Sequence, residues 1–474
     1  MAGSTCNHNI LYEGEAMGRI KVGFMTIMSE DKTWPQRIVD EFTQKHLEAK
    51  KVLEKTGWDI VTASNHLGRT YVEMVDQARM LREKGVQVLV LLVPDWTYSS
   101  HAAAAGLNIG VPVLVWADDS AGHSGIVGGS IVRGALDEVG VMTKLVHGGI
   151  GDPEVLKKIE RWCRGVAAAT LLRNTRIGLG GSRSMGMYTA HVDPSEIMKR
   201  FGVDIDGWEQ TDLIQKAQNI SPKETEEVWK WIGDTFGKVE VKAEVMAAQI
   251  NLYLALSHLI EEKEYDAICV KCLPELPTCY TTFCLAMALL NDRSDHRGPK
   301  ESIVCGCESD LNGTLTMMIL KSLDGGPAMF TDVQRFYKHN NEVGLMNCGS
   351  SATDFAVSKK EVYWVREGLL EFQWKMGAAC PQYLARAGRV TLARMGRIDG
   401  QYIMLIGGGE SIAYSREKLQ DLNPQHPQSY VRLDCSIDHL IENLRSNHIH
   451  FVFGDFIEEL KTACEVLQVI PIVL

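Results

Sequence analysis

The chain has 474 residues, of which 45% are hydrophobic and 23% are charged, and its formal net charge is −11. This length exceeds what one hydrophobic core usually supports, so we expect roughly three domains of ordinary globular composition. The negative charge and the lack of a basic block disfavour nucleic acid and membrane surfaces as partners, and favour a small polar or neutral molecule.

The amino terminus and the cysteines bear on the cellular compartment. Residues 1–20 show no basic start followed by an apolar segment and a small-residue cleavage site, so we expect no export signal. We also expect no membrane-spanning segment, because no apolar run has the necessary length. The 12 cysteines are scattered among apolar neighbours, which is typical of a reducing compartment. We therefore expect a cytoplasmic protein.

The first third of the chain alternates short apolar runs with helical patterns. The expected strands lie at 20–26, 58–63, 86–93 and 111–117. A long helix follows the first strand, opened by Trp34-Pro35 and closed by Gly57, and others are expected at 71–84 and 153–172. This alternation predicts a doubly wound parallel-sheet domain over 1–172. No GxGxxG motif follows its first strand, so the pattern does not imply a dinucleotide.

Polar residues follow two of these strands. One strand ends at Asp95-Trp96-Thr97-Tyr98, and another at Asp118-Asp119. A tryptophan among hydroxyl side chains suits a sugar ligand. The indole ring packs on the C–H groups of the sugar, while the hydroxyl side chains form hydrogen bonds with it. An alternative interpretation with equal support is that Trp96 packs at a domain or subunit interface.

A second α/β domain is predicted over 173–345. Residues 176–187 read as its first strand, with a Gly/Ser-rich end that either binds phosphate or forms a tight turn. A helical region at 194–262 is followed by a strand at 265–271 and a helix at 281–290. Cys269 and Cys272 form a CxxC pair, but no second CxxC stands at zinc-finger spacing, so reduced core thiols are the favoured interpretation. Lys271 ends a strand and either reaches a crevice or lies on the surface.

Two carboxylates in this domain are the main candidates for chemistry. Glu308 and Asp332 end two short apolar runs that flank a helix at 314–323. Strands ending side by side in an α/β sheet present their last residues to one crevice. A shared divalent cation would offset the repulsion between the two acids. The alternative is that Glu308 is a helix N-terminal carboxylate and Asp332 a turn former.

The last part, 346–474, is predicted to be a smaller β-rich (α+β) domain. Short strands are expected at 390–393, 402–407 and 430–433, then a helix at 456–467 and a final strand at 469–474. His448 and His450 alternate on one strand face. A neutral imidazole would complete a site begun by two carboxylates, although a structural role for the pair is the alternative.

Four short blocks together resemble the L-fucose isomerase family. They are Glu308-Ser-Asp-Leu-Asn-Gly, Met329-Phe-Thr-Asp-Val, Asn347-Cys-Gly-Ser-Ser-Ala and Ser446-Asn-His, and they occur in the family's order over essentially the full chain. The resemblance implies interconversion of a free sugar such as L-fucose or D-arabinose with its ketose through a cis-enediol. It also implies three domains, a divalent metal that is commonly Mn²⁺, and a homo-oligomer that is typically a hexamer. The ligand types also suit Mg²⁺ or Co²⁺.

The same resemblance implies roles for individual residues. Glu308 and Asp332 are the catalytic acid/base pair and also metal ligands, and His448 is the third protein ligand. The substrate-binding residues are Trp96, supplied by a neighbouring subunit, Ser350 and Asn447. No organic cofactor is implied.

Two departures from the family leave the sugar open. The loop after Glu308 is one residue shorter than in the long fucose isomerases, and this chain stops soon after His448. The alternatives are an L-arabinose-type isomerase, a non-catalytic sugar-binding protein, and a metal-dependent ketose-phosphate lyase with phosphate at Gly180-Gly-Ser-Arg-Ser. The expected lack of an export signal and the complete Glu/Asp/His set argue against the sugar-binding protein.

Overall fold

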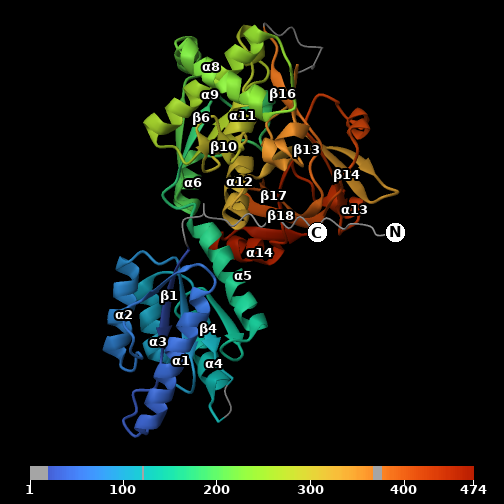
Figure 1. The fold of residues 1–474 in the computed structure, drawn as a ribbon. Coiled ribbons are helices and arrows are strands. Elements are labelled where there is room, and N and C mark those ends of the chain that lie inside the picture. The colour runs from blue at the N-terminus through green and yellow to red at the C-terminus, as the bar shows by residue number, and fades with distance from the viewer. Residues whose placement is uncertain (1–19, 120–121, 367–375) are drawn as a thin grey trace, which may run out of the picture.

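The computed structural model describes residues 20–119, 122–366 and 376–474. Two parallel sheets covered by helices are followed by a third, mixed sheet (Figure 1). This confirms the predicted fold class of two α/β units and a β-rich C-terminal part.

The first sheet has the strand order β2-β1-β3-β4-β5, which is the 2-1-3-4-5 order of one common class of doubly wound sheets. All its pairings are parallel. Its central strand is apolar throughout and fully buried, as expected when helices cover both faces. The strands are β1 (Lys21–Thr26), β2 (Asp59–Thr62), β3 (Val88–Val93), β4 (Val113–Ala117) and β5 (Thr143–His147). The helices are α1 (Gln36–Glu54), α2 (Tyr71–Glu83), α3 (Ser99–Ile109) and α4 (Gly125–Glu138).

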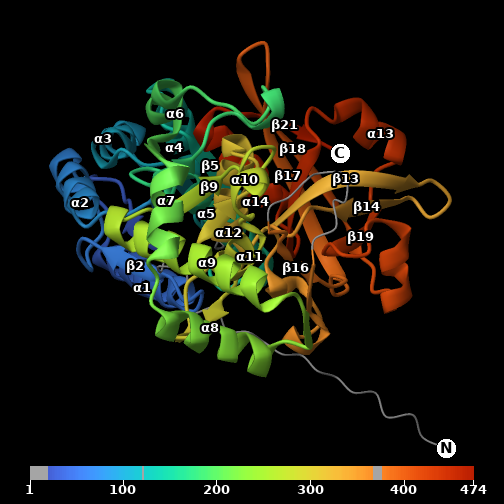
Figure 2. The ribbon, with the colours of Figure 1, turned by 90° about the horizontal axis from the view of Figure 1, so that it is seen from above.

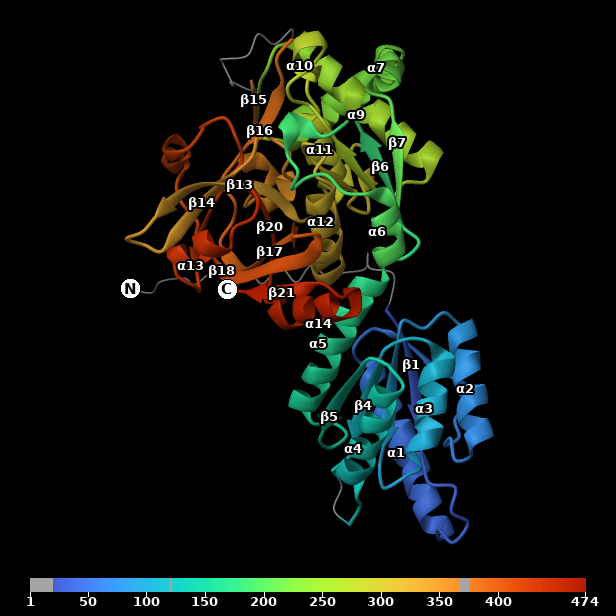
Figure 3. The ribbon, with the colours of Figure 1, turned by 180° about the vertical axis from the view of Figure 1, so that it is seen from behind.

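Helix α5 (Pro153–Thr170) joins this unit to the rest of the molecule. It begins with Asp152 as its N-cap and Pro153 in its first turn, a favourable start for a helix. Figure 3 shows α5 running beside α14 (Ile457–Leu467) near the other end of the chain. The two helices approach so closely that a Cβ on Gly165 would lie 2.5 Å from the backbone oxygen of Glu459.

The second sheet is also parallel, with the order β12-β9-β6-β7. Its strands are β6 (Arg176–Gly180), β7 (Asp204–Trp208), β9 (Ala267–Val270) and β12 (Val304–Gly306). The helices around it are α6 (Pro194–Phe201), α7 (Gln210–Gln218), α8 (Pro222–Thr235), α9 (Ala243–Lys263), α10 (Leu276–Cys279), α11 (Cys284–Asn291) and α12 (Leu311–Asp324). Smaller pieces are the hairpin β10 (Ser294–Asp295) and β11 (Gly298–Pro299), and a sheet of β8 (Lys238–Glu240), β15 (Tyr363–Arg366) and β16 (Ala379–Gln382).

Within the described residues, α9 is the one helix long and apolar enough to cross a membrane by length and composition. The sequence interpretation had expected no such segment. Of the apolar window in α9, 72% is buried inside the protein.

The mixed sheet contains a closed ring of six antiparallel strands. Its order is β17-β20-β13-β14-β19-β18, and β17 pairs with β18 to close the ring, while β21 adds to β18 in parallel. The strands are β13 (Met329–Tyr337), β14 (Glu342–Met346), β17 (Gly388–Ile398), β18 (Gln401–Ser411), β19 (Gln428–Leu433), β20 (His448–Phe453) and β21 (Ile470–Val473). The short helix α13 (Ile437–Asn443) lies between β19 and β20.

The expectation that Glu308 and Asp332 end strands of the same parallel sheet is wrong. Glu308 follows β12 of the second sheet, whereas Asp332 lies in β13 of the ring. β13 pairs with β20 from the far end of the chain, a long-range pairing that local sequence patterns do not reveal. β13 and most of β14 precede residue 345, so the ring begins before the predicted domain boundary; the boundaries themselves stay predictions.

Candidate functional site

The candidate site lies where α12 connects the second sheet to the ring. Helix α12 packs on β9 and β12 of that sheet and also on β17 and β20 of the ring. In the view from above, α12 lies between the helices around the second sheet and the strands β13 and β17 (Figure 2). The loop that carries Glu308 leads directly into α12, so this packing holds the loop against the ring.

The loop before α12 has an unusual backbone. Glu308 and Ser309 are consecutive non-glycine residues with φ values of 59° and 54°. Such left-handed residues cost about 1–3 kcal/mol each and persist only where their surroundings hold them. The backbone nitrogen of Ser309 donates to the oxygen of Val270 at 3.0 Å, and that of Asp310 donates to the oxygen of Cys307 at 3.0 Å. This strained turn aims the Glu308 side chain at the ring.

Three predicted ligand residues meet at this point. Asp332 and His448 are direct partners in the register between β13 and β20. His448 Nε2 lies 3.2 Å from Glu308 Oε2 and 3.5 Å from Asp332 Oδ1. The structure therefore brings together Glu308, Asp332 and His448 from a loop and two strands far apart in the sequence.

Asp310 fixes the orientation of the histidine. Its Oδ2 lies 2.6 Å from His448 Nδ1, and Arg394 holds the carboxylate with contacts of 2.5 Å from Nη1 and 3.1 Å from Nη2. Asp310 is also the N-cap of α12, accepting from the Gly313 nitrogen at 2.9 Å. Because Nδ1 is engaged with Asp310, Nε2 is the atom that faces the two acids. The sequence pattern assigns no role to Asp310; the local signal for one is a carboxylate directly before a helix.

Two amides hold Asp332. Asn347 donates to Oδ2 at 2.7 Å, and Asn447 donates to Oδ1 at 2.7 Å. Ser350 donates to Asn347 Oδ1 at 2.6 Å and is fully buried. Ser350 is not among the residues lining the cavity described below, so within this chain it acts on the site through Asn347.

The charges in the site influence one another. Burial and the nearby Glu308 outweigh His448 and the two amides, so that the pKa of Asp332 is raised to about 6. Burial disfavours charge on His448, but its hydrogen bond to Asp310 and the nearby carboxylates of Glu308 and Asp332 raise its pKa to about 10. The Arg394 guanidinium and His448 outweigh burial and hold the pKa of Asp310 well below its usual range.

The residues fit a divalent cation by their donor atoms. Among the described residues, no group of three or more His, Cys, Asp or Glu forms a ready-made metal cage. However, Glu308 Oε2 and His448 Nε2 are both buried without a hydrogen-bond partner, and they face each other. Donor atoms that share a cation at bonds of about 2.1 Å lie roughly 3 Å or more apart, so the separations around His448 Nε2 are compatible with a shared ion. Two carboxylates and an imidazole suit Mn²⁺, Mg²⁺ or Co²⁺.

The two acids line an open cavity of about 480 Å³. This volume is in the range of small-molecule sites. Its wall also includes Arg335, Cys348 and His426. The cavity therefore combines two acids with groups able to orient a polar ligand.

Two other predicted contacts lie elsewhere. Trp96 belongs to the first unit, is 44% exposed and packs edge-on against Tyr98, and it does not line this cavity. Lys271 is buried and its Nζ lies 2.8 Å from Glu275 Oε2, so it forms an ion pair rather than reaching the acids. The role of Trp96 in a neighbouring subunit stays a prediction.

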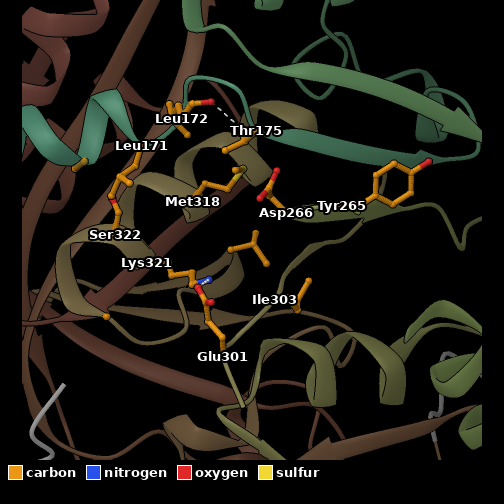
Figure 4. A pocket seen from close by; sticks show the side chains of 13 residues that line it. Leu171, Leu172, Thr175, Tyr265, Asp266, Glu301, Ile303, Met318, Lys321 and Ser322 are labelled. Carbon is orange, nitrogen blue, oxygen red and sulfur yellow. Dashed lines mark hydrogen bonds and ion pairs between the residues drawn. The ribbon is translucent and has the colours of Figure 1, made fainter. Parts of the chain in front are cut away.

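A second cavity of about 310 Å³ opens at the opposite end of the second sheet (Figure 4). Thr175, Asp266 and Ile303 line it, just before β6, β9 and β12. Its Lys321 is paired with Glu301 at 2.8 Å. It does not contain the Glu/Asp/His set, so the cavity at Glu308 is the candidate site.

The glycines of the Gly/Ser-rich segment serve close packing. A Cβ on Gly180 would lie 2.0 Å from Trp208 Cζ2, and one on Gly181 would lie 2.9 Å from Lys271 Cβ. Close packing therefore accounts for both glycines, and no phosphate-binding role is needed to explain them. No disulfide joins the cysteines of the described residues, and Cys269 and Cys272 of the CxxC pair are both buried.

Two family models match the chain. The L-fucose isomerase C-terminal domain matches residues 345–473, and the first N-terminal domain of L-fucose isomerase matches residues 29–174. A sulfoquinovose isomerase from Clostridium sp. (strain MSTE9) is 23% identical over 396 residues, covering 80% of this chain and 85% of the relative. A sulfoquinovose isomerase from Alkalicoccus urumqiensis is 23% identical over 314 residues, covering 64% of this chain and 67% of the relative. An L-arabinose isomerase from Nocardioides sp. (strain ATCC BAA-499 / JS614) is 26% identical over 108 residues, covering 23% of this chain and 21% of the relative.

Proposed function

Because this chain belongs to the L-fucose isomerase family and is an aldose–ketose isomerase, we propose that it converts a free aldose in the cavity beside Glu308 and Asp332. A divalent cation, Mn²⁺ first and Mg²⁺ or Co²⁺ as alternatives, is held by Glu308, Asp332 and His448. The observation that carries the proposal is the convergence of His448 Nε2 on both acids at the cavity wall.

The reaction moves one proton between adjacent carbons and another between their oxygens. One carboxylate removes the proton from C2 of the aldose and returns it to C1 of the cis-enediol, while the other exchanges the hydroxyl proton. When bound, the cation supplies Lewis-acid stabilisation of the negative charge that develops on the substrate oxygens. The amides of Asn347 and Asn447 hold the Asp332 carboxylate in a fixed direction for this proton transfer.

The first substrate candidate is L-fucose or D-arabinose, supported by the four sequence blocks. The second is an aldose that carries an anionic group such as a sulfonate. It is supported by the two relatives named sulfoquinovose isomerase and by Arg335, which lines the cavity with His426. A guanidinium binds such an anion through paired N–H donors. L-arabinose is a weaker candidate, since the relatives named L-arabinose isomerase match only about a quarter of the chain.

The other two alternatives have less support. A non-catalytic sugar-binding protein would not explain why the relatives are named isomerases. A ketose-phosphate lyase would need a phosphate site, and the glycines at Gly180 and Gly181 are accounted for by packing.

A metal-reconstitution screen tests the proposal. The protein is stripped with chelator, restored separately with Mn²⁺, Mg²⁺ and Co²⁺, and offered L-fucose, D-arabinose, L-arabinose and sulfoquinovose. We expect cation-dependent ketose from one of these sugars, detected by chromatography. Arg335→Gln separates the candidates, because it should impair a sulfonated sugar and spare a neutral one. Absence of ketose from every sugar despite bound metal would contradict the proposal.

A further inference from the structure

One wall of the cavity carries a thiol backed by other thiols. Cys348 follows β14, is partly exposed and lines the same cavity as Glu308 and Asp332. Four buried cysteines lie near it: Cys272, Cys284 and Cys307 interact with Cys348, and Cys380 interacts with Cys284. Among the described residues that line the cavity, Cys348 is the only cysteine.

These thiols are in contact. Cys284 Sγ lies 2.9 Å from the backbone oxygen of Cys348 and also interacts with its thiol, as does Cys307. Gly349 makes the turn after Cys348 with φ of 100°, and a Cβ there would lie 2.8 Å from Cys380 Sγ. The loop is therefore packed tightly onto the buried thiols.

The thiols of this cluster differ in their pKa. Hydrogen bonds from Cys284 and Cys307 hold the pKa of the Cys348 thiol well below its usual range, against the effect of burial. Contact with Cys348 and burial raise the pKa of Cys284. A thiolate is the nucleophilic form of cysteine, so the nucleophile is Cys348, the part-exposed cysteine whose residue lines the cavity.

One of the buried thiols is connected to the metal site. Cys307 immediately precedes Glu308, whose backbone is held in the left-handed region. The backbone oxygen of Cys307 accepts from Asp310, which orients His448. Any displacement of Cys307 therefore moves two acids of the site.

We propose that Cys348 is an oxidation-sensitive modification site on the wall of the isomerase cavity, which reacts with peroxide and then forms a disulfide with Cys284 or Cys307. A disulfide with Cys307 stops turnover because it draws the wall of the cavity onto the loop that carries Glu308. A disulfide with Cys284, at the start of α11, stops turnover because it displaces the loop in which Asn347 holds Asp332. The turnover part of this inference rests on the proposed function.

The reaction balances with hydrogen peroxide as the oxidant. The Cys348 sulfur attacks one peroxide oxygen, so an S–O bond forms, the O–O bond breaks and hydroxide leaves. The buried thiol then attacks that sulfur, so an S–S bond forms, the S–O bond breaks and a second hydroxide leaves. The two thiol protons neutralise the two hydroxides. Two thiols are oxidised by two electrons and one peroxide is reduced to two waters.

The test uses the full chain and two readouts. Reduced protein is treated with hydrogen peroxide, its remaining thiols are alkylated, and its disulfides are mapped by mass spectrometry. We expect a disulfide joining Cys348 to Cys284 or Cys307, with activity that falls and returns on adding dithiothreitol. Iodoacetamide should label Cys348 about tenfold faster than Cys435, which is similarly part-exposed but does not line the cavity.

Matched variants decide the outcome. Cys348→Ser should keep most of its own untreated activity after peroxide, whereas Cys435→Ser should lose activity as the unmodified chain does. A disulfide that lacks Cys348, or equal peroxide sensitivity of Cys348→Ser, would overturn the proposal. If no sugar is converted at all, the proposed function fails, but the disulfide map still decides the chemistry of Cys348.

Discussion

Asp332 illustrates how neighbouring residues adapt a single carboxylate. Its two oxygens each accept a hydrogen bond from an amide, Asn347 on one side and Asn447 on the other. These contacts fix its direction, while burial and Glu308 raise its pKa. The residue is therefore held in one direction by its amide partners, in an environment where a bound cation would offset the effect of burial on its charge.

Removing either acid should abolish the reaction. We expect Glu308→Gln and Asp332→Asn to lower kcat by about 10²–10⁴-fold if only acid–base catalysis is lost, and by more if the cation is lost too. The measurement is kcat for the converted sugar, with bound metal determined in parallel. Glu301→Gln is the matched control, because Glu301 pairs with Lys321 at the other cavity. Near-normal turnover of either acid variant would remove these residues from the mechanism.

The Asp310 carboxylate should control the affinity for metal. Asp310→Asn keeps the size of the side chain but weakens its contacts with His448 and Arg394, so we expect metal affinity to fall about 10–100-fold. Calorimetric titration with Mn²⁺ measures the change, and thermal unfolding monitors folding. Asp324→Asn at the other end of α12 is the control and should leave the affinity unchanged. An unaltered Mn²⁺ affinity in Asp310→Asn would show that Asp310 does not position His448.

At the scale of elements, α12 is what places a loop of one sheet against the strands of another. Ten of its fourteen residues are buried, because the helix is packed between the second sheet and the ring. Its first turn has little spare space. A Cβ on Gly313 would lie 2.7 Å from Asp310 Oδ2, 2.7 Å from His450 Nε2 and 2.8 Å from Arg394 Nη1.

This crowding predicts opposite effects for two Gly→Ala substitutions. Gly313→Ala should destabilise the protein by about 1–3 kcal/mol, because buried polar groups must move to admit the methyl group. Gly233→Ala in α8 meets nothing within 4 Å and should stabilise by about 0.5–1 kcal/mol, because alanine favours a helix. Denaturant unfolding measures the free energy of unfolding of each variant against that of the unmodified chain. Equal stability changes would mean that the turn at Gly313 has room that the structure does not show.

At the scale of the whole molecule, the first unit is joined through α5 and carries Trp96 away from the cavity at Glu308. Trp96 and Tyr98 are both exposed at the end of β3, the edge at which doubly wound sheets bind ligands. If a sugar contacts Trp96, the tryptophan must come from a second copy of the chain. We therefore propose a homo-oligomer, a hexamer by family resemblance.

Mixed oligomers test this arrangement. Trp96→Ala and Glu308→Gln are expected to be impaired as pure proteins. When they are co-expressed in equal amounts, about a quarter of the sites should combine an intact Glu308 with an intact neighbouring Trp96 and recover activity. The activity of tagged, purified mixtures is compared with that of each pure variant. No recovery in a confirmed mixed oligomer would place Trp96 and Glu308 in the same subunit, or remove Trp96 from the site.

The sequence by itself determined the local features of this protein. The alternation of apolar strands and capped helices predicted the first parallel sheet and part of the second, and the short strands after residue 388 predicted the β-rich end, because these patterns depend on neighbouring residues. The prediction of one helical region over 194–262 was wrong at β7, an edge strand of the second sheet that is only partly buried and therefore lacks a clear apolar pattern. Glu308, Asp332 and His448 could be chosen because carboxylates and an imidazole stand out within recognisable blocks. Only the tertiary structure decided how they meet. The pairing of β13 with β20, the closed ring and the contact of Asp310 with Arg394 join distant segments, and the free energy of such contacts depends on packing that no local pattern contains.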